Sequence, residues 1–117
     1  MEYLTKIQLI SLNTFIQQKQ GTRANIRDAR ALDYIIQSAH QEVFGRVLYP
    51  TVIDLASFYF INVIKKHVFN DANKRTAVLA LFMVLRLNHF KYKNNHESRL
   101  MIGELAIRSP KKHVHNQ

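Results

Sequence analysis

The chain has 117 residues, of which 47% are hydrophobic, so it is long enough for one domain with a core and too short for two. Cysteine is absent, and Gly (3) and Pro (2) are scarce, which excludes disulfides and thiolate metal sites and argues against disorder and a turn-dense β sandwich. Lys and Arg number 17 against 8 Asp and Glu, and this excess predicts an anionic partner: nucleic acid, nucleotide phosphates or an acidic protein. Because the basic residues form no dense stripe, nucleic acid is not expected as a direct ligand.

The spacing of apolar residues predicts two helices in the first part of the chain. Thr5 can cap the first and Gly21 can end it, and its apolar stripe consists of Leu9, Ile10, Leu12, Phe15 and Ile16. Asp28 can cap the second, whose apolar residues recur at three- and four-residue steps: Leu32, Ile35, Ile36 and Ala39.

A short hairpin or flap is predicted at about residues 41–50. Its residues are of strand-forming types around a flexible glycine: Val43, Phe44, Gly45, Arg46, Val47, Leu48 and Tyr49.

Two further helices carry apolar residues on all sides and therefore predict the core. Pro50 suits the first position of one, which runs to about Lys66 with Asp54 in its first turn. The other covers residues 77–87. A last helix is expected over residues 99–108, and residues 109–117 are expected to be flexible. The pattern as a whole predicts one all-α domain over residues 1–117.

The chain carries no pattern of a secreted or membrane protein. Its start lacks a basic region followed by a pure apolar run, and its longest apolar run, residues 77–85, is well short of the ~20 residues of a membrane span. A cytoplasmic protein is expected.

A polar segment, "KKHVFNDANKR", joins the two apolar helices. Asp71 is a good cap for the second of them, which would leave the first-turn amides of Ala72, Asn73 and Lys74 facing the loop as an anion pocket. Lys74 and Arg75 are misplaced there, since a cation near a helix N-terminus costs about 0.3 to 1 kcal/mol. This cost is understandable if an anion such as phosphate binds in front of them.

Other phosphate-binding motifs are excluded because the few glycines form neither GxxxxGKS nor GxGxxG. His67 lies close enough to serve as a general base for a hydroxyl near neutral pH. Asp71 offers one carboxylate, and Mg²⁺ on substrate phosphates commonly needs only one or two protein oxygens. Phe69, apolar in a polar loop, is predicted to anchor the loop in the core.

The segment "HVFNDANKR" resembles the signature HPFxxGNGR of the Fic/Doc superfamily. Val68, Ala72 and Lys74 match its Doc (death-on-curing) toxin branch, which has Lys at the second Gly of the Fic pattern. The flanks "RDARAL", "FGRVLYPT" and "NKRTAVLALFMVLRLN" are similar as well, and the resemblance covers about residues 4–90.

The resemblance implies a compact helical Fic fold and transfer of part of ATP to a hydroxyl side chain of a protein. Doc-type members transfer the γ-phosphate to a translation factor of the elongation factor Tu class and so block translation. By matching position, His67 would be the base and Asp71 the Mg²⁺ ligand, with residues 67–75 as the active-site loop. The phosphate cradle would be Ala72, Asn73, Lys74 and Arg75. The flap would align the target by main-chain pairing, and a Phd-like antitoxin would be the partner.

Two alternatives remain open. A Fic-type enzyme would transfer AMP instead, and Lys74 is the feature against it. A non-catalytic basic binding module would need a decayed motif, whereas His67, Asp71, Asn73 and Arg75 are all present.

Overall fold

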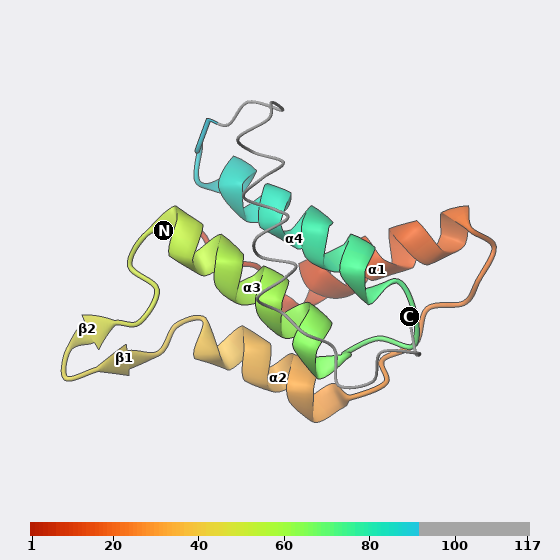
Figure 1. The fold of residues 1–117 in the computed structure, drawn as a ribbon, viewed down its shortest axis with the longest axis horizontal. Coiled ribbons are helices and arrows are strands. Elements are labelled where there is room, and N and C mark those ends of the chain that lie inside the picture. The colour runs from red at the N-terminus through yellow and green to blue at the C-terminus, as the bar shows by residue number, and fades with distance from the viewer. Residues whose placement is uncertain (92–117) are drawn as a thin grey trace.

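The computed structural model describes residues 1–91 of the protein, and Figure 1 shows how they are arranged. In chain order the elements are α1 (Lys6–Lys19), α2 (Ala29–Ser38), β1 (Glu42–Val43), β2 (Arg46–Val47), α3 (Val52–Lys66) and α4 (Asn73–Leu87). In this part of the chain, four helices and one two-stranded sheet confirm the all-α class with a short hairpin. The helix expected over residues 99–108 and the tail 109–117 lie outside the described residues.

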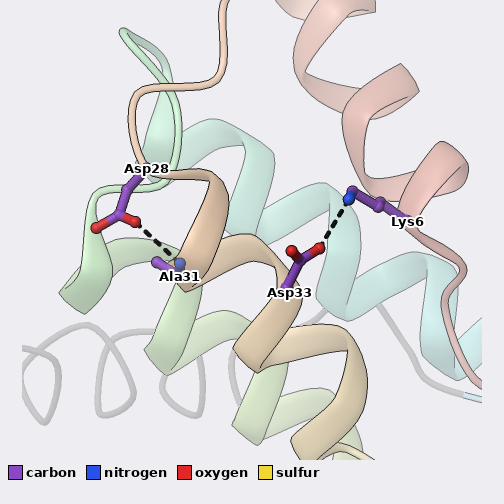
Figure 2. A network of polar contacts seen from close by, with 4 residues as sticks. All are labelled: Lys6, Asp28, Ala31 and Asp33. Carbon is purple, nitrogen blue, oxygen red and sulfur yellow. Dashed lines mark hydrogen bonds and ion pairs between the residues drawn. The ribbon is translucent and has the colours of Figure 1, made fainter.

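Side-chain caps set the starts of α1 and α2, as the sequence predicts. The Thr5 hydroxyl accepts a hydrogen bond from the Gln8 N–H at 3.1 Å, and the Gln8 side chain accepts one from the Thr5 N–H at 2.9 Å, which is a complete capping box. Figure 2 shows the cap of α2, where the Asp28 carboxylate accepts from the Ala31 N–H at 2.9 Å. Both caps satisfy amides that have no partner inside the helix.

The start of α3 differs from the prediction. Pro50 is not the first helical residue, because the helix begins at Val52 with Thr51 as its N-cap. The Thr51 hydroxyl accepts from the Asp54 N–H at 3.1 Å, whereas a helix starting at Pro50 would have Tyr49 at the cap position, with no oxygen near the amides. The capping oxygen therefore decides the boundary.

The core is built around α3, which lies between α2 and α4 in Figure 1 and packs most extensively on α4. Tyr59 and Phe60 point to different sides of α3 and are both buried, which confirms a helix covered all round. The Tyr59 hydroxyl accepts from the Leu4 N–H at 3.1 Å and so ties the N-terminal segment to the core. Its burial raises the pKa of Tyr59 to about 12. Within residues 1–91, no helix combines the length and apolarity needed to cross a membrane.

One ion pair joins α1 to α2. Figure 2 shows Lys6 of α1 reaching Asp33 of α2, with 2.7 Å between the ammonium nitrogen and a carboxylate oxygen. Both side chains are about half exposed, so the pair contributes under about 1 kcal/mol. The relative placement of the two helices is therefore held mainly by packing rather than by this pair.

The predicted flap is confirmed as a hairpin. Glu42 pairs with Val47 and Val43 with Arg46, which leaves a two-residue loop of Phe44 and Gly45. Both loop residues have positive φ, 51° and 78°, as the tight turns favoured in hairpins require. Such a turn normally takes Asn or Gly at its first position, so a phenylalanine there is unfavourable for the hairpin itself.

Candidate active site

The loop between α3 and α4 leaves one buried helix and enters the other through strained backbone. His67, the C-cap of α3, has φ 51° and ψ 58°, and Ala72, the N-cap of α4, has φ 61° and ψ 28°. Each left-handed non-glycine residue costs roughly 1–2 kcal/mol. Because both ends of this loop are strained, contacts with the rest of the protein must hold them in this conformation. Backbone strain of this kind is concentrated at functional sites.

The loop is held from inside by Phe69, which is only 1% exposed. The Asn73 side chain brackets it: the Asn73 Oδ1 accepts from the Phe69 N–H and the Asn73 Nδ2 donates to the Phe69 carbonyl, both at 2.9 Å. The Val68 carbonyl accepts from the N–H groups of Arg27 and Asp28 at 2.8 and 3.1 Å. The loop is therefore fixed to α4 and to the segment before α2.

These two hydrogen bonds limit how Asn73 can bind a phosphate. Its side chain is 4% exposed and both of its polar atoms are used by the loop. In the predicted cradle, Asn73 can therefore contribute its backbone amide and not its side chain.

Asp71 does not cap α4, which corrects the sequence prediction. The helix begins at Asn73 after the left-handed Ala72, and no side chain caps it. The Asp71 Oδ1 instead accepts from the Ala72 N–H at 2.8 Å, because the left-handed turn places that amide beside the carboxylate. The first-turn amides that face the loop are thus those of Asn73, Lys74 and Arg75, and the predicted contribution of the Ala72 amide is taken by Asp71.

Two buried residues of α1, which the sequence did not indicate as site residues, also donate hydrogen bonds to the loop. Asn13 and Gln17 are both 0% exposed. The Asn13 Nδ2 donates to the Asp71 carbonyl at 2.9 Å and to the Thr76 hydroxyl at 3.0 Å, and the Gln17 Nε2 donates to the Asn70 Oδ1 at 2.8 Å. The Gln17 Nε2 also donates to the Asn13 Oδ1 at 2.9 Å, which joins the two side chains into one network.

The spacing of these two residues along the helix could have indicated that they are buried. Asn13 and Gln17 follow the buried Leu9 at steps of four, so they share its face of α1. Phe15, which the predicted apolar stripe includes, is 54% exposed instead. Two polar residues on the buried face of a helix indicate a partner with unsatisfied backbone groups, and here that partner is the loop.

Lys74 and Arg75 are exposed in the first turn of α4, as predicted, and no acidic residue accompanies them in that turn. They edge a groove of about 520 Å³ between α1 and α4, to which Lys19 and Gln20 add polar groups and which is otherwise lined by apolar residues: Phe15, Ile16, Val78 and Leu79. Lys19, Lys74 and Arg75 thus place positive charge at this largely apolar groove, and the last two lie in the first turn of α4, whose free amides favour an anion such as phosphate.

Asp71 fits the role of a single carboxylate that shares Mg²⁺ with a bound nucleotide. It is exposed, and each of its oxygens accepts one hydrogen bond, from the Ala72 N–H and from the Gln20 side chain, so each keeps a lone pair. Within residues 1–91, no group of three His, Asp or Glu residues could hold a metal ion. A cation at Asp71 would therefore take its other ligands from substrate phosphates and water.

His67 is half-buried at the start of the loop, and its carbonyl accepts from the Arg27 Nε at 2.9 Å. This bond fixes the backbone from which the imidazole projects, at the opposite end of the loop from Lys74 and Arg75. Of the predicted site residues, hydrogen bonds connect Phe69 with Asn73 and Asp71 with Ala72, and the Gln20 side chain contacts both Asp71 and Arg75.

The predicted flap is not brought to the loop. The hairpin precedes the start of α3 and the loop follows its end, and Figure 1 shows them at opposite ends of the helix. A helix of 15 residues is about 22 Å long. In this arrangement the hairpin residues 43–49 do not line the groove beside Lys74 and Arg75.

Two comparisons with known proteins find relatives of this chain. Residues 3–85 match the model of the Fic/DOC family. The chain is also similar to the protein kinase doc of Escherichia phage P1, with 31% identity over 91 residues that cover 75% of this chain and 69% of the phage protein. The match includes the loop, the two helices that it joins and the α1 residues behind it, so the chain belongs to the Fic/DOC family.

Proposed function

We propose that this protein transfers the γ-phosphate of ATP to a hydroxyl side chain of a target protein. The observation that carries the proposal is the exposed pair Lys74 and Arg75 at a helix N-terminus beside Asp71. Two cations there are unfavourable without an anion and favourable with one. The similarity to the phage protein kinase supports phosphate as the transferred group.

In the proposed reaction, the His67 imidazole accepts the proton of the target hydroxyl. The hydroxyl oxygen then forms a bond to the γ-phosphorus as the bond between that phosphorus and the β–γ bridging oxygen breaks, and ADP leaves with the electron pair. Lys74, Arg75 and the first-turn amides stabilise the phosphate charge, and Asp71 would hold a Mg²⁺ ion that neutralises part of it. The strained loop fixes these groups before the substrate arrives.

The biological role that we propose is that of a toxin in a toxin–antitoxin pair. The target would be a translation factor of the elongation factor Tu class, whose modification blocks translation in the cytoplasm. A Phd-like antitoxin would neutralise the activity. The hairpin, at a distance from the loop, would hold the target through a surface remote from the reacting hydroxyl.

The proposal is tested with ATP labelled on either the γ- or the α-phosphate, in a cell extract with Mg²⁺. Label from the γ position that appears on protein, and is lost in His67→Ala, supports it. The matched control is His40→Ala, which removes an exposed histidine stacked on Tyr3 outside the loop and should retain transfer. Transfer from the α position would identify an AMP transferase, and transfer from neither would favour a non-catalytic binding module.

A further inference from the structure

Gln20 lies between the two charged groups that the proposed reaction needs, and every polar atom of its side chain is used. Its Nε2 donates to the Asp71 Oδ2 at 2.9 Å and to the Thr22 hydroxyl at 2.8 Å. Its Oε1 accepts a hydrogen bond from the guanidinium of Arg75. One neutral amide thus contacts both the carboxylate of Asp71 and the guanidinium of Arg75.

With Gln20 between them, Asp71 and Arg75 do not form an ion pair in the described part of the chain. The ion pair found within residues 1–91 is that of Lys6 and Asp33, although Asp71 and Arg75 are opposite in charge and only four residues apart. A direct pair would neutralise both groups and would have to break when a cation and a phosphate bind. An amide prevents this because it offers a donor to the carboxylate and an acceptor to the guanidinium.

Gln20 is held in place despite its exposure. It is the C-cap of α1, and its N–H donates to the Ile16 carbonyl at 3.2 Å. The Thr22 hydroxyl that accepts from Gln20 itself donates to the Oε1 of the buried Gln17 at 3.0 Å. The amide is therefore connected to the same buried network that supports the loop.

We propose that Gln20 is a positioning residue that keeps Asp71 and Arg75 separated and oriented for a cation and a phosphate, respectively. This inference rests on the proposed function, in which those two residues bind Mg²⁺ and ATP. Hydrogen-bond partners of a metal-binding carboxylate typically change metal affinity by about 10–100-fold when they are removed. The charged side chains of similar length cannot supply both contacts, because Glu would repel Asp71 and Lys would repel Arg75.

The test measures how ATP binding depends on Mg²⁺, by calorimetry at a series of Mg²⁺ concentrations. Gln20→Met keeps the length of the side chain and removes its hydrogen bonds, and Gln20→Asn keeps the amide but shortens its reach. The matched control is Gln18→Met, since Gln18 is exposed in the same last turn of α1 and its side chain makes no hydrogen bond within the described residues. Thermal unfolding of each variant checks that the fold is retained.

We expect both Gln20 variants to raise the half-saturating Mg²⁺ concentration about tenfold or more, while Gln18→Met stays within about twofold of the wild type and all three unfold at similar temperatures. An unchanged Mg²⁺ requirement in both Gln20 variants would overturn the inference and leave the proposed function standing. A wild-type protein that binds no ATP at any Mg²⁺ concentration would overturn the proposed function, and this inference with it.

Discussion

Replacing Lys74 by Glu is expected to stabilise the ligand-free protein and to abolish its binding of ATP. Lys74 is the second residue of α4, where the unpaired helix amides carry partial positive charge. Its side chain makes no hydrogen bond or ion pair within residues 1–91, so the substitution removes no polar contact of the fold. The helix-terminal charge alone then sets the change in stability.

The expected rise in the free energy of unfolding has two contributions, and both are stabilising. Removing an unfavourable cation and adding a favourable anion each contribute about 0.3 to 1 kcal/mol, so the free energy of unfolding should rise by about 0.6 to 2 kcal/mol. For a domain of this size, that is a rise of several degrees in Tm, by the rule of about 4–8 °C per kcal/mol. The gain should shrink in high salt, because exposed charges are screened.

The assay is thermal unfolding at low and high salt, with and without MgATP, and Lys65→Glu is the control. Lys65 is an exposed residue in the last turn of α3, where a cation is favourable, so its reversal should lower Tm by a similar amount. MgATP should raise the Tm of the wild type and of Lys65→Glu but not that of Lys74→Glu. A loss of stability in Lys74→Glu, or a normal response to MgATP, would refute the anion-site interpretation of this turn.

Three further results are expected. Asn13→Leu should lower the free energy of unfolding by about 2 to 4 kcal/mol in urea titration, because the Asp71 carbonyl and the Thr76 hydroxyl lose the hydrogen bonds that Asn13 donates and Gln17 loses one of its acceptors; a loss below about 0.5 kcal/mol would contradict the role of the network. Phe44→Asn should retain or raise Tm, since Asn suits the left-handed turn position, and should raise KM for the target protein without changing ATP affinity; an unchanged KM would exclude the hairpin from target binding. Tyr59 has its folded pKa raised from 10.0 to about 12 by burial, so its contribution to stability is complete below pH 10 and is lost as the pH rises from about 10 to 12. The stability difference between the wild type and Tyr59→Phe should therefore shrink between pH 9 and about pH 11 in denaturant titrations, and a constant difference would show that this hydroxyl does not titrate with folding.

The helical class and the order of the elements could be predicted because local signals agree with the packing. Thr5 and Asp28 act as the expected caps, and the apolar residues around Tyr59 mark the central helix. The starts of α3 and α4 were predicted wrongly for one physical reason. A helix boundary is decided by which oxygen reaches the first amides, and that depends on the backbone before the helix, left-handed at Ala72 and extended at Thr51.

The loop residues of the site could be predicted from their pattern, but the groups that hold them could not. Asn13, Gln17 and Gln20 lie more than fifty residues from the loop residues that they contact, so no spacing in the sequence connects them. For the hairpin, the local structure could be predicted from the sequence, but its position relative to the loop could not. Its formation follows from residues 42–47, but its distance from the loop follows from the direction of α3, which depends on packing against α2 and α4.

In the proposed reaction, transfer of the γ-phosphate requires the imidazole of His67. Its most direct test is phosphorus NMR of the nucleotide products after incubation with MgATP and purified elongation factor Tu, for the wild type and for His67→Ala. We expect the wild type to form ADP and phosphorylated protein in equal amounts, and His67→Ala to form neither. Release of pyrophosphate with AMP on the protein, or equal ADP formation by the variant, would contradict it.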